Sequence, residues 1–467
     1  MQLGDVLDDL TLDVATAALE VTRIEIDSRA CEPGTLFFAL PGTRSHGVEH
    51  ARDAVARGAV AVVSDRPVPA PVAAPVLVVP PSQIGALVAH ASAVVTGEPQ
   101  TRTKLVAVTG TNGKTTVTTL VADLARRLGW NAGAIGTLTG ARTTPAPPEL
   151  YRALAHEVDA FDPAVADGVV ALEVSSHALD QRRIEGLFFC VAAFTNLGHE
   201  HLDYHGTMEA YFEAKASLFT PERARRAVVW TDDPYGARLA ERTALPVTAV
   251  GRADAEEVVS SLTGSTFFWR GHLVNSPLVG DYNVDNVLVA LAVAAGLGLD
   301  EAELARAVAE VAPVPGRFEV IRGQEVTVVV DFAHTPEGLA RLLDDVRALQ
   351  PSARVVTVFG AGGDRDRTKR PEMGAAVAAR SDAVVLTSDN PRTESPDAIM
   401  DDVAAGIGSG AVVVREVDRR RAIAAAIAAA GAGDVVVVAG KGHETTQIVG
   451  DTVTPFDDRE VAREFVR

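Results

Sequence analysis

The segment VTGTNGKTTVTTL, residues 108–120, carries the residue types of a phosphate-binding loop. It follows the apolar run KLVAVT and precedes a helical pattern, the strand–loop–helix context that such a loop requires. Gly110 and Gly113 let backbone N–H groups approach phosphate oxygens, and the helix N-terminus adds a favourable dipole. Lys114 can reach the β- and γ-phosphates of a nucleotide, and the hydroxyl of Thr115 can ligate magnesium. This context favours a nucleotide site over an ordinary glycine turn. The spacing is unusual, however, because the second glycine comes three positions after the first, whereas it comes five positions after the first in the common P-loop G-x-x-x-x-G-K-[ST].

Two further polar turns follow predicted buried strands. Glu173 ends the apolar run GVVALEV, with Ser175 and His177 in the same turn, and a carboxylate beside a phosphate loop suits a magnesium ion. GHEHLDYH then places His199, His201 and His205 after the strand CVAAFT. Their spacing is not that of a zinc site. Histidines in a turn are more often solvated or structural, but the end of a strand favours a site.

Lys215 lies within the apolar helical pattern YFEAKASLF. The residues alone favour a lysine whose stem packs on the core while its amine reaches solvent. The alternative is a buried amine, whose pKa desolvation would lower.

Four polar loops in the last third of the chain each follow a predicted strand. They are DFAHTPEG (331–338), GAGGDRDRTKRPEMG (360–374), SDNPRTESP (388–396) and AGKGHET (439–445). Ligands of α/β sheets bind at the carboxyl ends of the strands, so the four loops predict one cleft for a charged small molecule.

The elements that position these residues predict an α/β protein of three domains. Residues 1–97 form a small α/β domain with helical patterns near 48–57 and 82–96. Residues 98–314 hold a central P-loop-type parallel sheet, because KLVAVT, GVVALEV, CVAAFT and RAVVWT are apolar throughout. A linker, VAPVPGR, leads into residues 315–467, where five repeats of strand then helix predict a doubly wound, Rossmann-like domain. The alanine-rich segment 422–433 is predicted to be a buried helix.

Composition excludes several classes of protein. The chain has 467 residues and a net charge of -19, which argues against a nucleic-acid binder. Its two cysteines, Cys31 and Cys190, form no C-x-x-C pair, so we expect neither a disulfide framework nor a cysteine zinc site. We find no signal peptide and no apolar run long enough to span a membrane, and therefore expect a soluble cytoplasmic protein without membrane insertion.

With these residues in view, the chain resembles the Mur ligase family, specifically its MurE type. The resemblance runs from residue 26 to residue 462 and rests on TGTNGKTT, EVSSHALDQRR, HLDYHGTMEAYFEAKASLF, DFAHTP, GGDRDRTKRPEMG, DNPR and GKGHE in this order. The family uses the compact loop G-x-x-G-K-[ST] for ATP, which accounts for the short glycine spacing. The resemblance assigns the UDP-sugar precursor to residues 1–97, ATP to 98–314 and the incoming amino acid to 315–467.

The resemblance also implies roles for individual residues. ATP would be bound by Gly110, Thr111, Asn112, Gly113, Lys114, Thr115, Thr116, Asn283, Asn286, Arg317 and Asp331. The catalytic residues would be Lys114, Glu173, His201 and Lys215, with magnesium held by Thr115, Glu173, His201 and Lys215 in carbamylated form. The precursor would be bound by Ser28, Thr143, Thr144, Ser175, Gln181 and Arg183. The amino acid would be bound by Arg365, Asp389, Asn390, Pro391, Arg392, Gly440 and Glu444.

In the family, DNPR accompanies meso-diaminopimelate rather than lysine, and Arg392 can form a bidentate pair with the distal carboxylate that lysine lacks. Three segments depart from the family pattern. GHEH stands in place of SRDH, so that Glu200 replaces an aspartate. Ala146 follows TTP where an acidic residue is common, and SHG (45–47) stands where DG is common.

The expected activity is an ATP-dependent amide ligation that adds meso-diaminopimelate to UDP-MurNAc-L-Ala-D-Glu through an acyl phosphate, with ATP and magnesium as cofactors. We expect small-molecule substrates only and a monomer. The main alternative is a ligase of the same fold with another acceptor, either L-lysine or the substrate of a pathway-specific paralogue or folylpolyglutamate synthetase. A P-loop kinase and a non-catalytic UDP-sugar binding module are two further alternatives.

Overall fold

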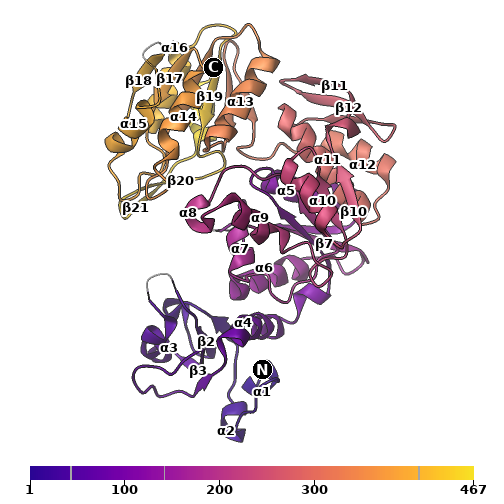
Figure 1. The fold of residues 1–467 in the computed structure, drawn as a ribbon, viewed down its shortest axis with the longest axis vertical. Coiled ribbons are helices and arrows are strands. Elements are labelled where there is room, and N and C mark those ends of the chain that lie inside the picture. Colours follow the sequence, from indigo (N-terminus) through magenta and orange to yellow (C-terminus); the bar gives the residue numbers. More distant parts are fainter. Residues whose placement is uncertain (43–44, 141, 409–410, 467) are drawn as a thin grey trace.

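Three α/β regions follow one another along an elongated molecule (Figure 1). The computed structural model describes residues 1–42, 45–140, 142–408 and 411–466. The N-terminal and C-terminal regions lie at opposite ends, and the central region lies between them (Figure 1). Each region is built around its own sheet, which confirms the predicted α/β class. Within the described residues no helix is both long enough and apolar enough to cross a membrane.

The N-terminal region contains a parallel sheet of order β1-β2-β3-β4. Its strands are β1 (Arg23–Glu25), β2 (Thr35–Ala39), β3 (Ala59–Ser64) and β4 (Val76–Val78). Its helices are α1 (Leu3–Val6), α2 (Val14–Ala17), α3 (Ala51–Ala56) and α4 (Pro81–Val95), with 3₁₀ turns at Ser28–Ala30 and Gly47–His50. Strand β2 is buried on both faces, as its apolar run predicts.

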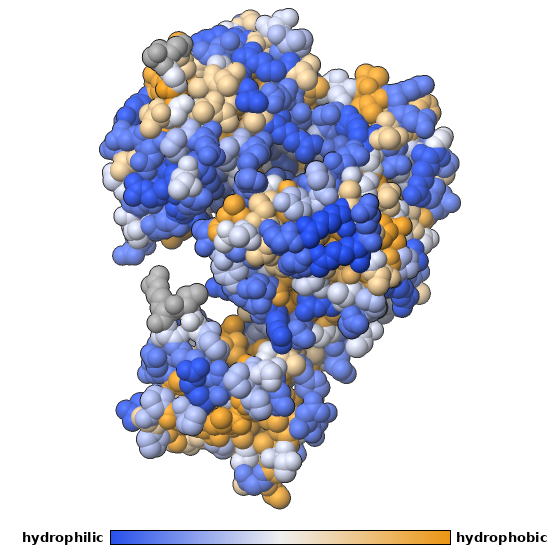
Figure 2. Space-filling model, in the orientation of Figure 1, coloured by the Kyte–Doolittle hydropathy of each residue, from blue (hydrophilic) through white to orange (hydrophobic). Residues whose placement is uncertain are grey.

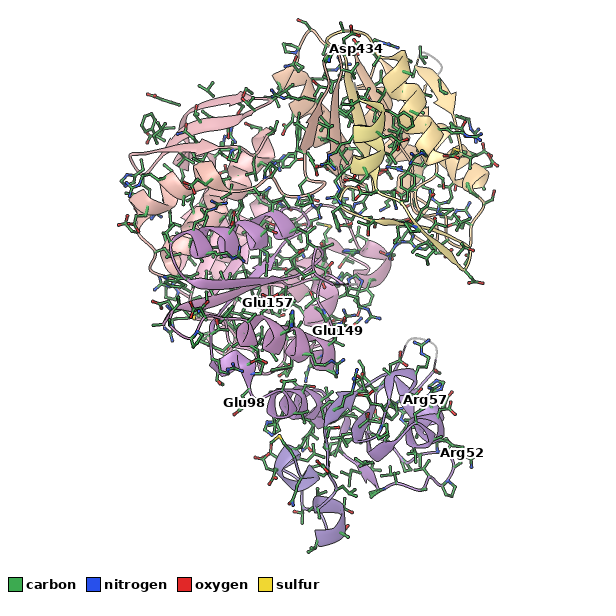
Figure 3. The ribbon with its side chains drawn as sticks, turned by 180° about the vertical axis from the view of Figure 1, so that it is seen from behind. Arg52, Arg57, Glu98, Glu149, Glu157 and Asp434 are labelled. Atoms are coloured by element: carbon green, nitrogen blue, oxygen red, sulfur yellow. The ribbon has the colours of Figure 1, made fainter. Side chains whose placement is uncertain are left out.

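The junction with the central region is short. Figure 3 shows Glu98 between the two regions, and Glu149 and Glu157 on the helix α6 (Pro147–Asp159) nearby. Glu98 has a φ of 51° and precedes the 3₁₀ turn Pro99–Thr101. Arg152 of α6 donates to the carbonyl oxygen of Ile24 at 3.1 Å and pairs with Glu25. These contacts tie the N-terminal region to α6.

The central region contains a six-stranded parallel sheet of order β10-β9-β8-β5-β7-β6. Its strands are β5 (Lys104–Thr109), β6 (Asn131–Ile135), β7 (Gly168–Glu173), β8 (Val191–Phe194), β9 (Ala227–Trp230) and β10 (Val247–Val250). The four predicted strands are confirmed. The sequence did not reveal β6, because NAGAI is short and rich in small residues.

Helices cover both faces of this sheet. One buried cluster joins the sheet to α5 (Lys114–Arg127), α11 (Asp281–Gly296) and α12 (Glu301–Ala307), and to an antiparallel sheet of β11 (Glu256–Ser261), β12 (Gly264–Trp269) and β13 (His272–Ser276). The opposite cluster includes α6, α7 (Ser176–Asp180), α9 (Met208–Ala216) and α10 (Pro234–Arg242). The short helix α8 (Leu202–His205) and 3₁₀ turns at Arg252–Asp254 and Val308–Glu310 complete the region.

The C-terminal region is a doubly wound sheet of order β14-β15-β19-β16-β17-β18, as predicted. Its strands are β14 (Glu319–Arg322), β15 (Thr327–Asp331), β16 (Val355–Phe359), β17 (Ala383–Leu386), β18 (Val412–Arg415) and β19 (Val435–Ala439). Strand β14 is antiparallel to β15. On one face lie α13 (Pro336–Leu349), α14 (Lys369–Ala378) and α15 (Pro396–Ala404), and on the other lie α16 (Arg419–Ala429) and α17 (Asp458–Phe465).

Two details of this region differ from the sequence-based expectation. The alanine-rich helix α16 was predicted to be buried, but only one of its faces is buried and the other is open to solvent. The fifth strand is followed by a hairpin, β20 (Thr446–Val449) and β21 (Thr452–Pro455), before helix α17 begins. Figure 3 shows Asp434, which precedes β19, at the outer end of the region, so the carboxyl end of this strand faces the central region.

The C-terminal region docks on the N-terminus of α11. The Asp345 carboxylate on α13 accepts hydrogen bonds from the backbone N–H groups of Asp281 (2.7 Å) and Tyr282 (3.4 Å). The Tyr282 hydroxyl donates to Asp331 at 2.8 Å, and Arg341 pairs with Asp285. In contrast, Figure 2 shows an open gap between the N-terminal and C-terminal regions on this face of the molecule.

Candidate active site

The loop between β5 and α5 requires both of its glycines. Gly110 has a φ of 150°, and a Cβ atom there would lie 1.9 Å from Oγ1 of Thr195. Gly113 has a φ of 85°, and a Cβ atom there would lie 2.4 Å from Oδ1 of Asn286. A larger residue at either position would collide with one of these side chains and would also adopt a positive φ, which L residues rarely do. Gly110 and Thr111 are buried, while Asn112 and Gly113 are more open and lead into the N-terminus of α5, where an anion is favoured.

Two lysines converge on the same carbonyl group of this loop. Lys114 Nζ donates to the carbonyl oxygens of Gly110 (2.9 Å) and Thr111 (2.8 Å). Lys215 Nζ, on α9, donates to the carbonyl oxygen of Gly110 at 2.8 Å. Burial lowers the pKa of both amines, and for Lys215 the charge of Lys114 lowers the pKa further. Lys215 is 1% exposed, so the residue-based preference for a solvent-reaching amine was wrong.

Oxygen donors gather beside the loop. Glu173, at the end of β7, accepts a hydrogen bond from the Thr115 hydroxyl at 3.0 Å. The backbone N–H and hydroxyl of Thr137 donate to the same carboxylate at 2.8 and 3.0 Å, which fixes its orientation. In the part of the chain that the structure describes, no three acidic, histidine or cysteine side chains come together as a metal cage. Hydroxyl and carboxylate donors in small number fit magnesium, which commonly retains waters and binds substrate phosphates.

A cavity of about 590 Å³ surrounds the loop and reaches the C-terminal region. Most of the residues assigned to ATP line it, namely Thr111, Asn112, Gly113, Lys114, Thr115, Thr116, Asn286, Arg317 and Asp331, together with Thr143, Glu173 and His201. Asn283 lies behind the wall, where its side chain accepts a hydrogen bond from Asn286 and donates to the carbonyl of Val279. Gly110 and Lys215 are not in the wall.

Arg317 connects the C-terminal region to the phosphate loop. Its guanidinium donates to the Thr115 hydroxyl at 3.1 Å and stacks over the Phe332 ring. Asp331, at the end of β15, accepts hydrogen bonds from the backbone N–H groups of Phe318 and Ala333 and from the Tyr282 hydroxyl. Asp331 thus holds the segment that carries Arg317, in addition to lining the cavity.

A second contact between regions joins Glu200 to His334. One ring nitrogen of His334 lies 3.2 Å from Oε1 of Glu200, and the other lies 2.8 Å from the carbonyl oxygen of Phe332. The His334 ring thus links the carboxylate of Glu200 to the backbone of its own loop. Burial raises the pKa of Glu200, but the His334 contact outweighs it and holds this pKa well below its usual range. Burial lowers the pKa of His201 to about 4, so its imidazole is neutral at pH 7.

The residues assigned to the precursor fall into two groups. On the central region, Arg183 donates to the carbonyl of Thr144 (2.8 Å) and to the side chain of Gln181 (2.6 Å). The Thr144 hydroxyl donates to the carbonyl of Glu173, and its oxygen also accepts from the backbone N–H of Ser175. Thr143 lies in the cavity wall. Ser28 lies apart from these residues, buried in the N-terminal region.

The four polar loops of the C-terminal region meet in one cavity, as predicted. It has a volume of about 350 Å³ and is lined by Arg365, Asp389, Asn390, Arg392, Gly440 and Glu444, among others. Pro391 is not in the wall. Arg392 has a φ of 52°, and its guanidinium donates to the carbonyl oxygen of Gly363 at 2.5 Å.

The two cavities share a wall. Both are lined by Glu200, His201, Phe332, His334 and Glu337. A group bound over the phosphate loop and an amine bound among the four loops would therefore meet at this wall. The arrangement suits transfer from a nucleotide to an acid and then to an amine.

Several residues of the site were not predicted from the sequence. Thr137, Tyr282 and His334 hold other site residues through hydrogen bonds, although none was assigned a role. Lys441 was assigned no role either, but it is fully buried against Asn390 and Glu444. Its position within AGKGHET, between two assigned residues, was the available signal.

Three family models match the chain. They are the Mur ligase family catalytic domain (residues 20–96), the Mur ligase middle domain (residues 108–294) and the Mur ligase glutamate ligase domain (residues 316–442). Together they account for most of the chain.

Relatives match over nearly the full length. A UDP-N-acetylmuramoyl-L-alanyl-D-glutamate--2,6-diaminopimelate ligase from Gloeobacter violaceus is 43% identical, over 99% of this chain and 98% of the relative. The ligase of the same name from Thermosynechococcus vestitus is 44% identical, over 96% of this chain and 93% of the relative. A solved structure of a ligase with this name matches with a TM-score of 0.67 and 33% identity, covering 100% and 98% of the two chains. The Thermotoga maritima MurF ligase, solved with ADP, shares the fold at 19% identity, with a TM-score of 0.64 over 91% and 94% of the two chains.

Proposed function

The chain belongs to the Mur ligase family, and we propose that it adds meso-diaminopimelate to UDP-MurNAc-L-Ala-D-Glu in an ATP-dependent amide ligation of peptidoglycan precursor synthesis. One observation carries the proposal beyond family membership. A cavity around a phosphate loop shares a wall with a cavity that contains Arg392 and Glu444. This geometry suits two consecutive reactions on one carboxyl group.

In the first reaction, the terminal D-Glu carboxylate attacks the γ-phosphorus of ATP, the bond to ADP breaks, and an acyl phosphate forms. Lys114 and Arg317 approach the loop from two regions of the chain and would offset the charge on the phosphoryl group. The backbone N–H groups of Gly113 and of the first turn of α5 would hold the phosphates, because those of Thr111 and Asn112 already donate to Asn196. Asn286 would line the base end of the nucleotide site.

Magnesium fits the oxygen donors beside the loop. Thr115 and Glu173 would hold it, with His201 and a carbamylated Lys215 completing the protein's share. When bound, the ion supplies positive charge that polarises the phosphate oxygens. Thr137 would keep the Glu173 carboxylate in place.

Carbamylation of Lys215 is supported by its surroundings. Only a neutral amine attacks carbon dioxide, and burial beside Lys114 lowers the pKa of Lys215 well below its usual range. The amine forms a bond to carbon, loses a proton, and becomes a carbamate with two oxygen donors. This change would replace a buried amine with an anion beside Gly110.

In the second reaction, the amine of the amino acid attacks the acyl carbon and phosphate leaves. The amine must lose a proton, and Glu200 and His201 are acceptors in the shared wall. Arg392 and Arg365 would bind carboxylates of meso-diaminopimelate, and Glu444 would accept from its ammonium group. Docking of the C-terminal region through Arg317 would exclude water, which otherwise hydrolyses the acyl phosphate.

The remaining assignments follow the same division of the chain. We assign the UDP-sugar precursor to residues 1–97, ATP to residues 98–314 and the amino acid to residues 315–467. The precursor would extend from Ser28 in the N-terminal region to Thr144, Ser175 and Arg183 in the central region. We propose that the enzyme acts as a monomer. We propose that it acts in the cytoplasm, where ATP and UDP-linked precursors are available.

The test is formation of product from ATP, magnesium and UDP-MurNAc-L-Ala-D-Glu, with meso-diaminopimelate, L-lysine or no amino acid, followed by phosphate release and mass spectrometry. We expect a tripeptide product and phosphate release with meso-diaminopimelate only. Product with L-lysine alone would keep the ligase and refute the role of Arg392. No product with either amino acid would refute the proposed substrates.

A further inference from the structure

Lys441 is a buried cation that makes its contacts inside the wall of the amino-acid cavity. Its side chain is fully buried, and its ammonium donates to Oδ1 of Asn390 (3.1 Å) and to Oε2 of Glu444 (2.9 Å). A buried ammonium requires such partners, because it has lost its hydration. Lys441 itself is not in the cavity wall, whereas Asn390 and Glu444 are.

These contacts fix two side chains that line the cavity. Oδ1 of Asn390 accepts from Lys441 and from the backbone N–H of Ile448 at 3.0 Å, and Nδ2 of Asn390 donates to Oε2 of Glu444 at 2.8 Å. A flipped amide would direct its NH₂ group at two donors. Oε2 of Glu444 thus receives two hydrogen bonds, while Oε1 of Glu444 has no partner among the described residues. That second oxygen is left to bind a ligand.

The hairpin β20–β21 holds the loop of residues 389–392, to which Asn390 belongs, through further hydrogen bonds. Gln447 donates through Nε2 to the carbonyl oxygen of Asp389 at 2.8 Å. The backbone N–H of Arg392 donates to the carbonyl of Ile448 (3.1 Å), and the backbone N–H of Gly450 donates to the carbonyl of Arg392 (2.7 Å). Arg392 has a left-handed φ of 52°, a conformation that a non-glycine residue adopts only when its surroundings hold it there.

The hairpin has little other structural role. Strand β21 is exposed along its whole length, and no residue of 446–455 belongs to a buried hydrophobic cluster within the described chain. Its hydrogen bonds to residues 389–392 are its principal contacts outside itself. A change in its side chains should therefore affect the cavity more than the fold.

We propose that Lys441 and Gln447 are positioning residues for the amino-acid substrate, which act through Asn390, Glu444 and Arg392 without touching the substrate. The proposal rests on the proposed function, since it concerns the site for the diamino acid. Lys441 fixes the orientation of the Asn390 amide and the position of one carboxylate oxygen of Glu444. Gln447 fastens the hairpin that keeps Arg392 in its left-handed conformation.

The test is steady-state kinetics of the full-length chain, with meso-diaminopimelate, ATP and UDP-MurNAc-L-Ala-D-Glu varied in turn. We expect Gln447→Ala to raise KM for the amino acid about tenfold and to leave the other two KM values within about twofold, because one hydrogen bond to the loop is lost. Lys441→Met should raise KM for the amino acid further. If Lys441→Met does not fold, the result for Gln447→Ala alone tests the proposal. Thr452→Ala, an exposed change on the same hairpin, is the matched control and should alter none of them.

A double variant separates positioning from general destabilisation. If Gln447 acts through Arg392, then Gln447→Ala should add much less to KM in an Arg392→Ala background than in the unaltered chain. An unchanged KM for the amino acid in Gln447→Ala, or an equal rise in all three KM values with a lower melting temperature, would overturn the inference. If the unaltered chain forms no product in this assay, the proposed function fails instead.

Discussion

The two cavities are built in different ways. The cavity around residues 110–113 depends on backbone, because Gly110 and Gly113 have positive φ values and a Cβ atom at either would collide with a neighbouring side chain. The cavity of the C-terminal region depends on side chains from four loops, and Arg392 adopts a left-handed conformation there without being a glycine. A site formed by backbone groups tolerates few substitutions, whereas in a site formed by side chains each contact with the ligand can be changed separately by one substitution. Changes in the first cavity should therefore abolish the reaction, and changes in the second should change its amino acid.

The largest effect is expected for Lys114→Ala. The lysine supplies charge that matters most in the transition state of phosphoryl transfer, so kcat should fall about 10³-fold or more. KM for the amino acid should change little, because Lys114 lies outside the second cavity. Lys104→Ala is the control, since Lys104 is on the preceding strand and pairs with Asp167 at the surface. Equal losses in the two variants would contradict the assignment.

Lys215→Ala should reduce kcat about 10²-fold, since it removes the group that would become a carbamate. Mass spectrometry of the native protein, prepared with bicarbonate at neutral to alkaline pH, should show one added carbon dioxide that is absent from the variant. Bicarbonate should also restore activity to an unaltered enzyme depleted of carbon dioxide. A fully active Lys215→Ala would remove carbamylation from the mechanism.

Arg392→Lys should weaken selection in the second cavity without stopping the chemistry. The guanidinium binds a carboxylate through two parallel hydrogen bonds, and an ammonium cannot. KM for meso-diaminopimelate should rise about 10- to 100-fold, corresponding to about 1.4–2.7 kcal/mol. The discrimination against L-lysine should fall by a similar factor. Arg415→Lys, on the exposed strand β18, should leave both values unchanged.

The sequence predicted much of this contrast. The short loop, Glu173 and the four polar loops follow apolar strands, so their place at strand ends could be inferred from the order of elements. The contacts between regions could not be inferred, because Glu200 and His334 are far apart in the chain and neither residue type requires the other. The burial of Lys215 was also hidden, since an apolar helix face does not show whether its amine reaches solvent.

A smaller effect, on stability, is expected at the junction between α13 and the N-terminus of α11, where the C-terminal region contacts the central region. Burial raises the pKa of Asp345 to about 6, from an ordinary value of 3.8. The folded state therefore binds an extra proton between about pH 4 and pH 6, and the free energy of unfolding should fall as the pH rises through this window. The fall should be at most about 2 kcal/mol, because the side chain is partly exposed.

Asp345→Asn should flatten this part of the stability profile, measured by urea unfolding at pH 4, 5, 6 and 7. Asp344→Asn is the matched control, because Asp344 is the adjacent residue and pairs with Arg380 at the surface. If both variants keep the slope of the unaltered chain, Asp345 does not titrate at the junction as described.

The central claim is that the precursor's carboxyl group is phosphorylated over residues 110–113 before an amine attacks it across the shared wall. It can be tested with UDP-MurNAc-L-Ala-D-Glu whose terminal carboxylate carries ¹⁸O in both positions. Each phosphate released with meso-diaminopimelate should contain one ¹⁸O atom, because an oxygen of that carboxylate leaves with the phosphoryl group. Tripeptide product accompanied by unlabelled phosphate would contradict the central claim.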